Sequence, residues 1–290
     1  MTVTLAMQLV DAGQLKLDDT LAQRWPAFQA PGAAQITVRH LMQHLSGLAQ
    51  PVDGPVDADG ILSFYRRKGP PWQPEALRIC AGPAAAVPGE RFRYGDCDTL
   101  VLAGLLEHLT GQTIPQLMQQ RVAQPLQLRS LRLNQGRTRA MAVAMDASGR
   151  PVPQPVMATY GAGGAMEGTA RDLLSFSRAL LAGRLVSAAS RQAMWTGDPK
   201  WGYAGLGVWA FTAPIAGCAK PVELVERRGY VGGIQARNII APARGVSVVM
   251  FSNQADFDFG EIWQGKGFSH DLLAAALGAP AEGQPAPLPR

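Results

Sequence analysis

The sequence lacks the long apolar segments that would mark a membrane protein. No apolar run in the 290 residues approaches the roughly 20 residues that a membrane-spanning helix needs. The first residues, MTVTLAMQLVDAG, also lack the basic start and the small-residue cleavage site of a signal peptide. The sequence therefore predicts no membrane span, and it leaves the compartment open between cytoplasm and periplasm.

Cysteine is scarce, and its spacing gives no sign of a metal site. Cys80, Cys97 and Cys218 are odd in number and widely spaced, without a C-x-x-C pair. We therefore expect free buried thiols rather than a zinc site or a disulfide framework. His40 and His44 stand four residues apart, as metal ligands on a helix do, but no third ligand is evident nearby. Both are predicted to be polar helix positions, and no metal is expected.

Sequence signatures of cofactor sites are missing as well. The chain contains no G-x-G-x-x-G, P-loop, H-E-x-x-H or G-x-S-x-G motif, so we expect no cofactor. The net charge of +5 and the pI near 9.4 could suit an anionic partner. However, the basic residues are dispersed and no nucleic-acid-binding motif accompanies them, so no nucleic-acid partner is expected.

What the chain does have is a core helix at its very beginning. Between Val3 and Val10, six of eight residues are apolar and leave only a thin polar stripe. A helix that is apolar nearly all round is predicted to be buried. Gly13 follows as the left-handed residue that ends it.

Hydrophobic periodicity predicts a change of structure near residue 200. Helices are predicted at 38–47, 99–110, 114–122, 170–182 and 187–195, with Asp18 or Asp19 capping a short early helix. The proline-rich stretch 69–89 is predicted to be irregular. Four β-rich runs then follow, at 206–211, 222–228, 235–241 and 246–252, and a last helix at 269–277.

The short links between these runs predict an antiparallel meander, so the fold class is α+β. Residues 1–200 should form a mainly helical region. Residues 201–277 should supply the sheet and a covering helix of the same fold, and 278–290 a flexible tail.

The order of the segments resembles a known family. The order runs LAMQLVDAG, ITVRHLMQHLSGL, GERFRYGDCDTLVLAGLLEHLTGQ, GYAGLGVWAF and RRGYVGGIQARNIIAPARGVSVVMFSNQ. This set resembles the serine β-lactamase-like family, which includes class C β-lactamases, D-alanyl-D-alanine carboxypeptidases, D-aminopeptidases and esterases. The resemblance covers roughly residues 1–277. It implies a β-lactamase/transpeptidase-like fold and hydrolysis through an acyl-enzyme.

The family's nucleophile is a serine in a Ser-x-x-Lys motif at the start of a buried helix. Residues three apart on a helix share a face, so the lysine amine lies beside the serine hydroxyl. Leu9 to Gly13 match the end of that helix, which puts the lysine just before Met1, and Ser-x-x-Lys occurs nowhere in the chain. The resemblance therefore implies a chain cut just after the motif, without the family's N-terminal helix and first strands.

Two further family elements have counterparts in the chain. Tyr94-Gly95-Asp96 stands at the Tyr-x-Asn position, so by resemblance Tyr94 would be the general acid/base, and Asp96 replaces the asparagine that contacts the substrate amide. Tyr230-Val231-Gly232 was matched to the Lys-Thr-Gly strand motif, with Tyr230 and Gly232 bordering the cleft. The backbone N–H of Gly233 would then be an oxyanion-hole donor.

Two hypotheses follow from these matches. The first is a serine hydrolase of this family that acts on an ester, an amide or D-peptide, or a β-lactam. Because this chain lacks the nucleophile motif, it is expected to be inactive by itself. The alternative is a non-catalytic pseudoenzyme that serves as a binding or regulatory module. Ser46, in His-Leu-Ser-Gly-Leu, is interpreted as architectural rather than nucleophilic. A small-molecule or peptide substrate is expected, and the oligomeric state stays open.

Overall fold

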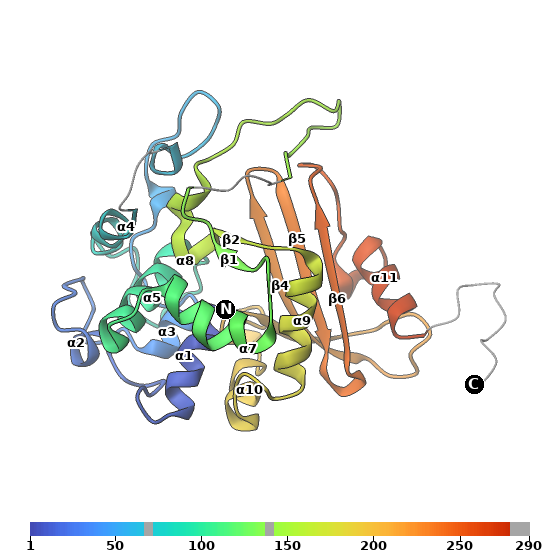
Figure 1. Cartoon of the computed structure of the whole chain (residues 1–290), viewed down its shortest axis with the longest axis horizontal. Helices are drawn as coiled ribbons and strands as arrows, with labels where there is room; N and C mark the ends of the chain where they lie inside the picture. The colour runs from blue at the N-terminus through green and yellow to red at the C-terminus, as the bar shows by residue number, and fades with distance from the viewer. Residues whose placement is uncertain (67–71, 137–141, 279–290) are drawn as a thin grey trace.

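A helical part and a four-stranded antiparallel sheet lie side by side (Figure 1). The structure is a computed structural model that describes residues 1–66, 72–136 and 142–278. The helices are α1 (Thr2–Asp11), α2 (Leu21–Arg24), α3 (Val38–Met42), α4 (Trp72–Cys80), α5 (Asp96–Thr110), α6 (Ile114–Met118), α7 (Gln124–Leu126), α8 (Gly161–Gly164), α9 (Ala170–Leu181), α10 (Ala188–Met194) and α11 (Phe268–Ala276). The strands are β1 (Arg132–Leu133), β2 (Met166–Glu167), β3 (Trp209–Ala213), β4 (Val222–Val231), β5 (Ile234–Ala241) and β6 (Val246–Ser252). The α+β class is thereby confirmed.

The opening helix α1 is buried, as its apolar pattern predicts. Leu5, Met7 and Leu9 are each no more than 2% exposed, and they belong to the core that α1 shares with α5. The helix ends through a left-handed Gly13, whose N–H donates to the carbonyl of Val10 at 3.0 Å. The predicted helix and its glycine terminus are both confirmed.

Three local predictions in the helical part are wrong. Thr20, not Asp18 or Asp19, caps α2, because its hydroxyl oxygen accepts the N–H of Gln23. Helix α3 stops at Met42 instead of continuing to Gly47, since His44 already adopts a left-handed backbone with φ +58°. The proline-rich stretch holds α4, whose Pro74 lies in the first helical turn, where a missing N–H costs little.

The prediction of free thiols is also wrong for two of the three cysteines. Cys80, at the end of α4, forms a disulfide with Cys97, in the first turn of α5, and their Cα atoms are 5.3 Å apart. The pairing depends on α4 packing beside α5, which a separation of 17 residues does not reveal. Cys218 is free, as expected.

The predicted meander is confirmed. The sheet order is β3-β4-β5-β6 with every neighbouring pair antiparallel. Gly232 and Gly233, with φ of 55° and 82°, form the two-residue turn between β4 and β5. Positive φ at both positions is the requirement of a type I′ hairpin, which suits glycine.

A helix packs on each face of the sheet. Because side chains alternate along a strand, neighbouring residues of one strand contact different helices. Leu224 of β4 and Ile239 of β5 pack with Leu273 of α11 on one face. On the opposite face Val225 and Ile240 form a smaller cluster, toward which the end of α9 packs. No helix in the described part of the chain is long and apolar enough to cross a membrane.

Candidate active site

Tyr94 lies at the junction between the helical part and the sheet. It sits in the extended segment just before α5, and its side chain is 45% exposed. The next residue must be glycine, because a Cβ at Gly95 would stand 2.2 Å from Oε1 of Gln50. That close approach fixes the segment on the buried Gln50, while the phenol ring faces outward.

Arg227 of β4 reaches the phenol oxygen of Tyr94. Its Nη2 donates a hydrogen bond of 2.9 Å to the Tyr94 hydroxyl, and its Cζ stands 5.3 Å from the Tyr94 ring centre. The same guanidinium lies 5.7 Å from the ring of Trp209. The guanidinium of Arg227 therefore lies against the phenol oxygen, where a positive charge stabilises negative charge that forms during a reaction.

Sequence reasoning missed Arg227. The match of Tyr230-Val231-Gly232 to the strand motif fell three residues too late to include it. Side chains alternate along a strand, so Arg227 and Tyr230 point to opposite faces of β4. The signal that would have found Arg227 is its place in the Arg-Arg-Gly that precedes Tyr230.

The structure does not bring Tyr230, Gly232 and Gly233 to Tyr94. Tyr230 is 63% exposed near the hairpin tip, and Gly232 lies roughly 16 Å along the strand from Arg227 at about 3.3 Å per residue. The carbonyl of Gly232 accepts a hydrogen bond from Nε2 of Gln154 at 2.7 Å, and Gly233 packs against Ala144. These glycines form a packed turn, distant from the phenol.

Asp96 does lie beside Tyr94, in the first turn of α5. Its carboxylate accepts a hydrogen bond from the hydroxyl of Tyr65, whose ring stacks on Tyr160 with centres 3.9 Å apart. Burial raises the pKa of Asp96 above its ordinary value. The hydrogen bond from Tyr65 lowers the pKa of Asp96, but the effect of burial is larger. Burial also raises the pKa of Tyr160 to about 12 and that of Tyr65 further, so these two phenols stay protonated. Of the three tyrosines, Tyr94 is the most exposed to solvent.

A buried histidine and aspartate support the other side of the Tyr94 ring. The rings of His44 and Tyr94 have centres 4.5 Å apart, and Nδ1 of His44 lies 3.7 Å from Oδ2 of Asp98. Asp98 also accepts a hydrogen bond of 3.2 Å from Nε2 of Gln50. His44 has a left-handed backbone that few non-glycine residues adopt. Such a conformation persists only where the surrounding structure maintains it, so the packing around His44 holds its ring against Tyr94.

These histidines do not form a metal centre in the described residues. The Nδ1 of His40 accepts a hydrogen bond from the N–H of Thr37 at 3.3 Å. This hydrogen bond is part of the capping box at the start of α3. No group of three His, Cys, Asp or Glu side chains suited to a metal ion occurs among the residues whose positions are described. Ser46 is buried, and its hydroxyl accepts the N–H of Leu48 at 3.1 Å, within a turn.

Comparison with known proteins identifies the family. The sequence model of the Beta-lactamase family matches residues 1–265, so the chain belongs to that family. Among solved structures it is similar to a D-stereospecific amidohydrolase from Streptomyces sp. (24% identity, TM-score 0.74, 97% of this chain and 84% of that one). It is also similar to the D-amino acid amidase from Ochrobactrum anthropi SV3 (20% identity, TM-score 0.74, 95% and 79%). At these identities the likeness establishes the fold.

Curated relatives are longer than the region they share with this chain. Penicillin-binding protein 4 of Amycolatopsis lactamdurans is 32% identical over 190 residues, which are 61% of this chain and 47% of that protein. The esterase/beta-lactamase LipL of Mycobacterium tuberculosis is 30% identical over 137 residues, 46% of this chain and 29% of LipL. The chain therefore spans about half or less of the length of these relatives.

Proposed function

We propose that this chain carries the proton-transfer half of a serine-hydrolase centre, with Tyr94 as the general acid/base. The single observation that carries the proposal is the 2.9 Å hydrogen bond from Arg227 to the Tyr94 hydroxyl. Tyr94 would take the proton from an attacking hydroxyl and return it to the leaving group. Arg227 would stabilise the negative charge on the phenol oxygen between these two transfers.

Asp96 has a supporting role in the proposal. It stands at the position where the family's asparagine contacts the substrate amide, beside Tyr94 and under the hydroxyl of Tyr65. The raised pKa of Asp96, caused by burial, favours the protonated carboxylic acid. A protonated carboxyl both donates and accepts a hydrogen bond, as an asparagine side chain does. The substrate would be an ester, an amide or D-peptide, or a β-lactam.

The acylated serine is the part of the centre that this chain does not offer. None of its serines begins a Ser-x-x-Lys. We therefore expect no serine adduct on the 290-residue chain after treatment with a fluorophosphonate or benzylpenicillin, measured by intact mass and peptide mapping. A stoichiometric serine adduct would overturn this part of the proposal.

The missing Ser-x-x-Lys also supports the second candidate, a non-catalytic binding module. Chemical reactivity of Tyr94 separates the two candidates, since a module that only binds ligands does not require an activated phenol. Tyr94, Tyr203 and Tyr230 are 45%, 47% and 63% exposed, so access alone predicts similar labelling.

Nitration by tetranitromethane, which attacks the ionised phenol, tests the proposal at neutral pH. Peptide mapping by mass spectrometry measures each tyrosine separately, so Tyr203 and Tyr230 are internal controls. We expect Tyr94 to react faster than either control, because the guanidinium of Arg227 donates a hydrogen bond to the phenol oxygen at which negative charge develops. Equal rates for the three tyrosines would favour the binding module.

A further inference from the structure

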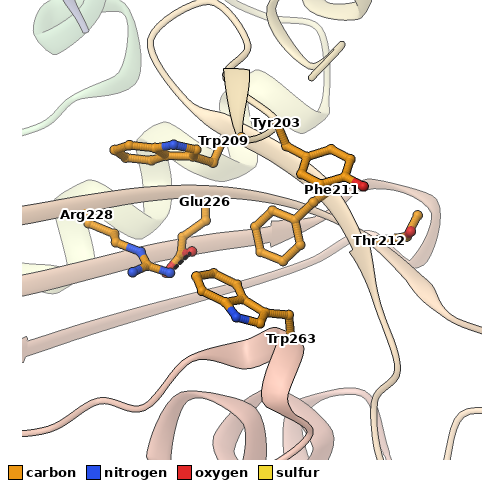
Figure 2. A pocket seen from close by; sticks show the side chains of 8 residues that line it. Tyr203, Trp209, Phe211, Thr212, Glu226, Arg228 and Trp263 are labelled. Carbon is orange, nitrogen blue, oxygen red and sulfur yellow. Dashed lines mark hydrogen bonds and ion pairs between the residues drawn. The ribbon is translucent and has the colours of Figure 1, made fainter. Parts of the chain in front are cut away.

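A cavity of about 550 Å³ is lined by side chains of β3 and β4 on the α11 face of the sheet. Four aromatic side chains line it: Tyr203, Trp209, Phe211 and Trp263 (Figure 2). The rings of Phe211 and Trp263 meet edge to face with centres 5.8 Å apart. Ligand sites of several hundred Å³ with mainly apolar walls and a few polar groups are typical of small-molecule binding.

The polar groups of the cavity are already neutralised. Arg228 donates to Glu226 at 2.9 Å and to Glu261 at 2.6 Å, and its guanidinium lies 5.1 Å from the Trp263 ring centre. Arg237 lies behind Glu226 at 3.5 Å. Two carboxylates thus face two guanidinium groups. A charged ligand would disturb this balance, whereas an uncharged one would not.

The aromatic walls are held in place by the backbone as well as by packing. Tyr203 has a left-handed backbone with φ +64°, which is strained for a bulky residue. Its N–H donates to the carbonyl of Asp198 at 2.8 Å, and its carbonyl accepts the N–H of Ala210 at 3.0 Å. Backbone strain that the surrounding structure maintains is concentrated at ligand sites.

Trp209 joins the cavity to the candidate active site. Its indole lines the cavity and also lies 6.0 Å, centre to centre, from the ring of Tyr94. Arg227 stacks on the same indole at 5.7 Å. The two sites are therefore separated by one side chain, and Arg227 and Arg228 send their guanidinium groups to opposite sides of β4.

We propose that this cavity binds a flat, uncharged aromatic group of the substrate whose scissile bond lies at Tyr94. That the bound group belongs to a substrate rests on the proposed function. That the cavity binds an aromatic group does not depend on the proposed function. Aromatic walls stack on a flat ring, and the neutralised Arg228 offers no free cation to a carboxylate. The expected substrates carry a phenyl-, indole- or naphthalene-like group on one side of the ester or amide.

Binding of three probes tests the proposal without catalysis. We would titrate 2-naphthamide, 2-naphthoate and acetamide into ¹⁵N-tryptophan-labelled protein and follow the indole N–H signals of Trp209 and Trp263 by NMR. We expect saturable shifts of both signals with 2-naphthamide, weaker binding of the anionic 2-naphthoate, and no response to acetamide. Absence of a saturable shift with 2-naphthamide, or stronger binding of 2-naphthoate, would overturn the proposal.

Matched variants locate the binding. Phe211→Ala should weaken 2-naphthamide binding about tenfold, whereas Phe251→Ala, which removes a 46% exposed phenylalanine from β6 of the same sheet, should not change it. Trp263→Phe keeps an aromatic side chain in the wall of the cavity and should retain most of the affinity. This variant tests the lining of the cavity with a smaller change than Phe211→Ala, which could misfold. Equal affinities of the Phe211 and Phe251 variants would contradict the assignment.

Tyr94→Phe separates this inference from the proposed function. The variant removes the hydroxyl that Arg227 contacts but leaves the cavity lining intact. It should therefore bind 2-naphthamide as the parent chain does. Loss of binding in Tyr94→Phe would overturn the independence of the cavity, whereas a failed nitration test with normal binding would remove only the acid/base role of Tyr94.

Discussion

The two sides of strand β4 use consecutive arginines in different ways. On one side Arg227 donates a hydrogen bond to the hydroxyl oxygen of Tyr94. On the other side Arg228 donates to the carboxylates of Glu226 and Glu261. Burial by itself lowers the pKa of Arg228, but the hydrogen bonds that Arg228 donates to the two glutamates outweigh the effect of burial and raise the pKa. We therefore propose that arginine serves proton transfer on one side and structure on the other, because different groups face it.

The largest expected effect is a loss of stability on the Arg228 side. Glu226 is 1% exposed and pairs with both Arg228 and Arg237, so Glu226→Ala takes the paired carboxylate from Arg237 and leaves Arg228 with Glu261 alone. We expect a loss of about 3–5 kcal/mol in the free energy of unfolding, measured by urea denaturation. Arg227→Met should cost less than about 1 kcal/mol, since its contacts are at the surface of the site. Equal losses would erase the distinction between the two sides.

A disulfide should contribute the next largest effect, on the Tyr94 side. Cys80–Cys97 closes a segment of 17 residues that begins at the end of α4 and ends one residue after Asp96. The double variant Cys80→Ala/Cys97→Ala should lose about 3 kcal/mol of stability. Cys218→Ala, the matched control at the free cysteine, should lose less than about 0.5 kcal/mol. Insensitivity of the melting temperature to a reductant would argue that the bond is absent in solution.

The smallest effect concerns the pH dependence that Asp96 imposes. Its folded-state pKa is raised by burial, so the folded protein holds this proton more tightly than the unfolded chain. Stability from this group is therefore full below the ordinary pKa of about 4 and falls as pH rises toward the raised value. Asp96→Asn should remove that fall and be slightly more stable than the parent at neutral pH. Parallel curves of melting temperature against pH for the two proteins would show that Asp96 is not responsible.

The fold class could be predicted from the sequence because each helix and strand is indicated by the residues within its own segment. The apolar positions of α1, the helical pattern at 170–182 and the β-rich run at 246–252 are each local features of the sequence. The candidate site could be proposed from the sequence only in part. Tyr94 and Asp96 follow from a motif within one segment, but the contact of Arg227 with Tyr94 joins residues 133 positions apart.

The disulfide and the aromatic cavity were out of reach for the same reason. Cys80 pairs with Cys97 only because α4 and α5 pack together. The cavity needs Trp263, which precedes α11, to fold back against Phe211 of β3. Register also matters, because the shift of three residues in β4 from Arg227 to Tyr230 changes the face of the sheet.

The most direct test of the account compares the two arginines through the reactivity of Tyr94. Nitration of Tyr94 by tetranitromethane would be measured by peptide mapping in Arg227→Met and Arg228→Met, with Tyr230 as the internal standard. We expect Arg227→Met to slow nitration of Tyr94, because the phenol oxygen loses the guanidinium that donates to it, while Arg228→Met should leave the rate unchanged. Equal rates of Tyr94 nitration in the two variants would contradict the proposed role of Arg227.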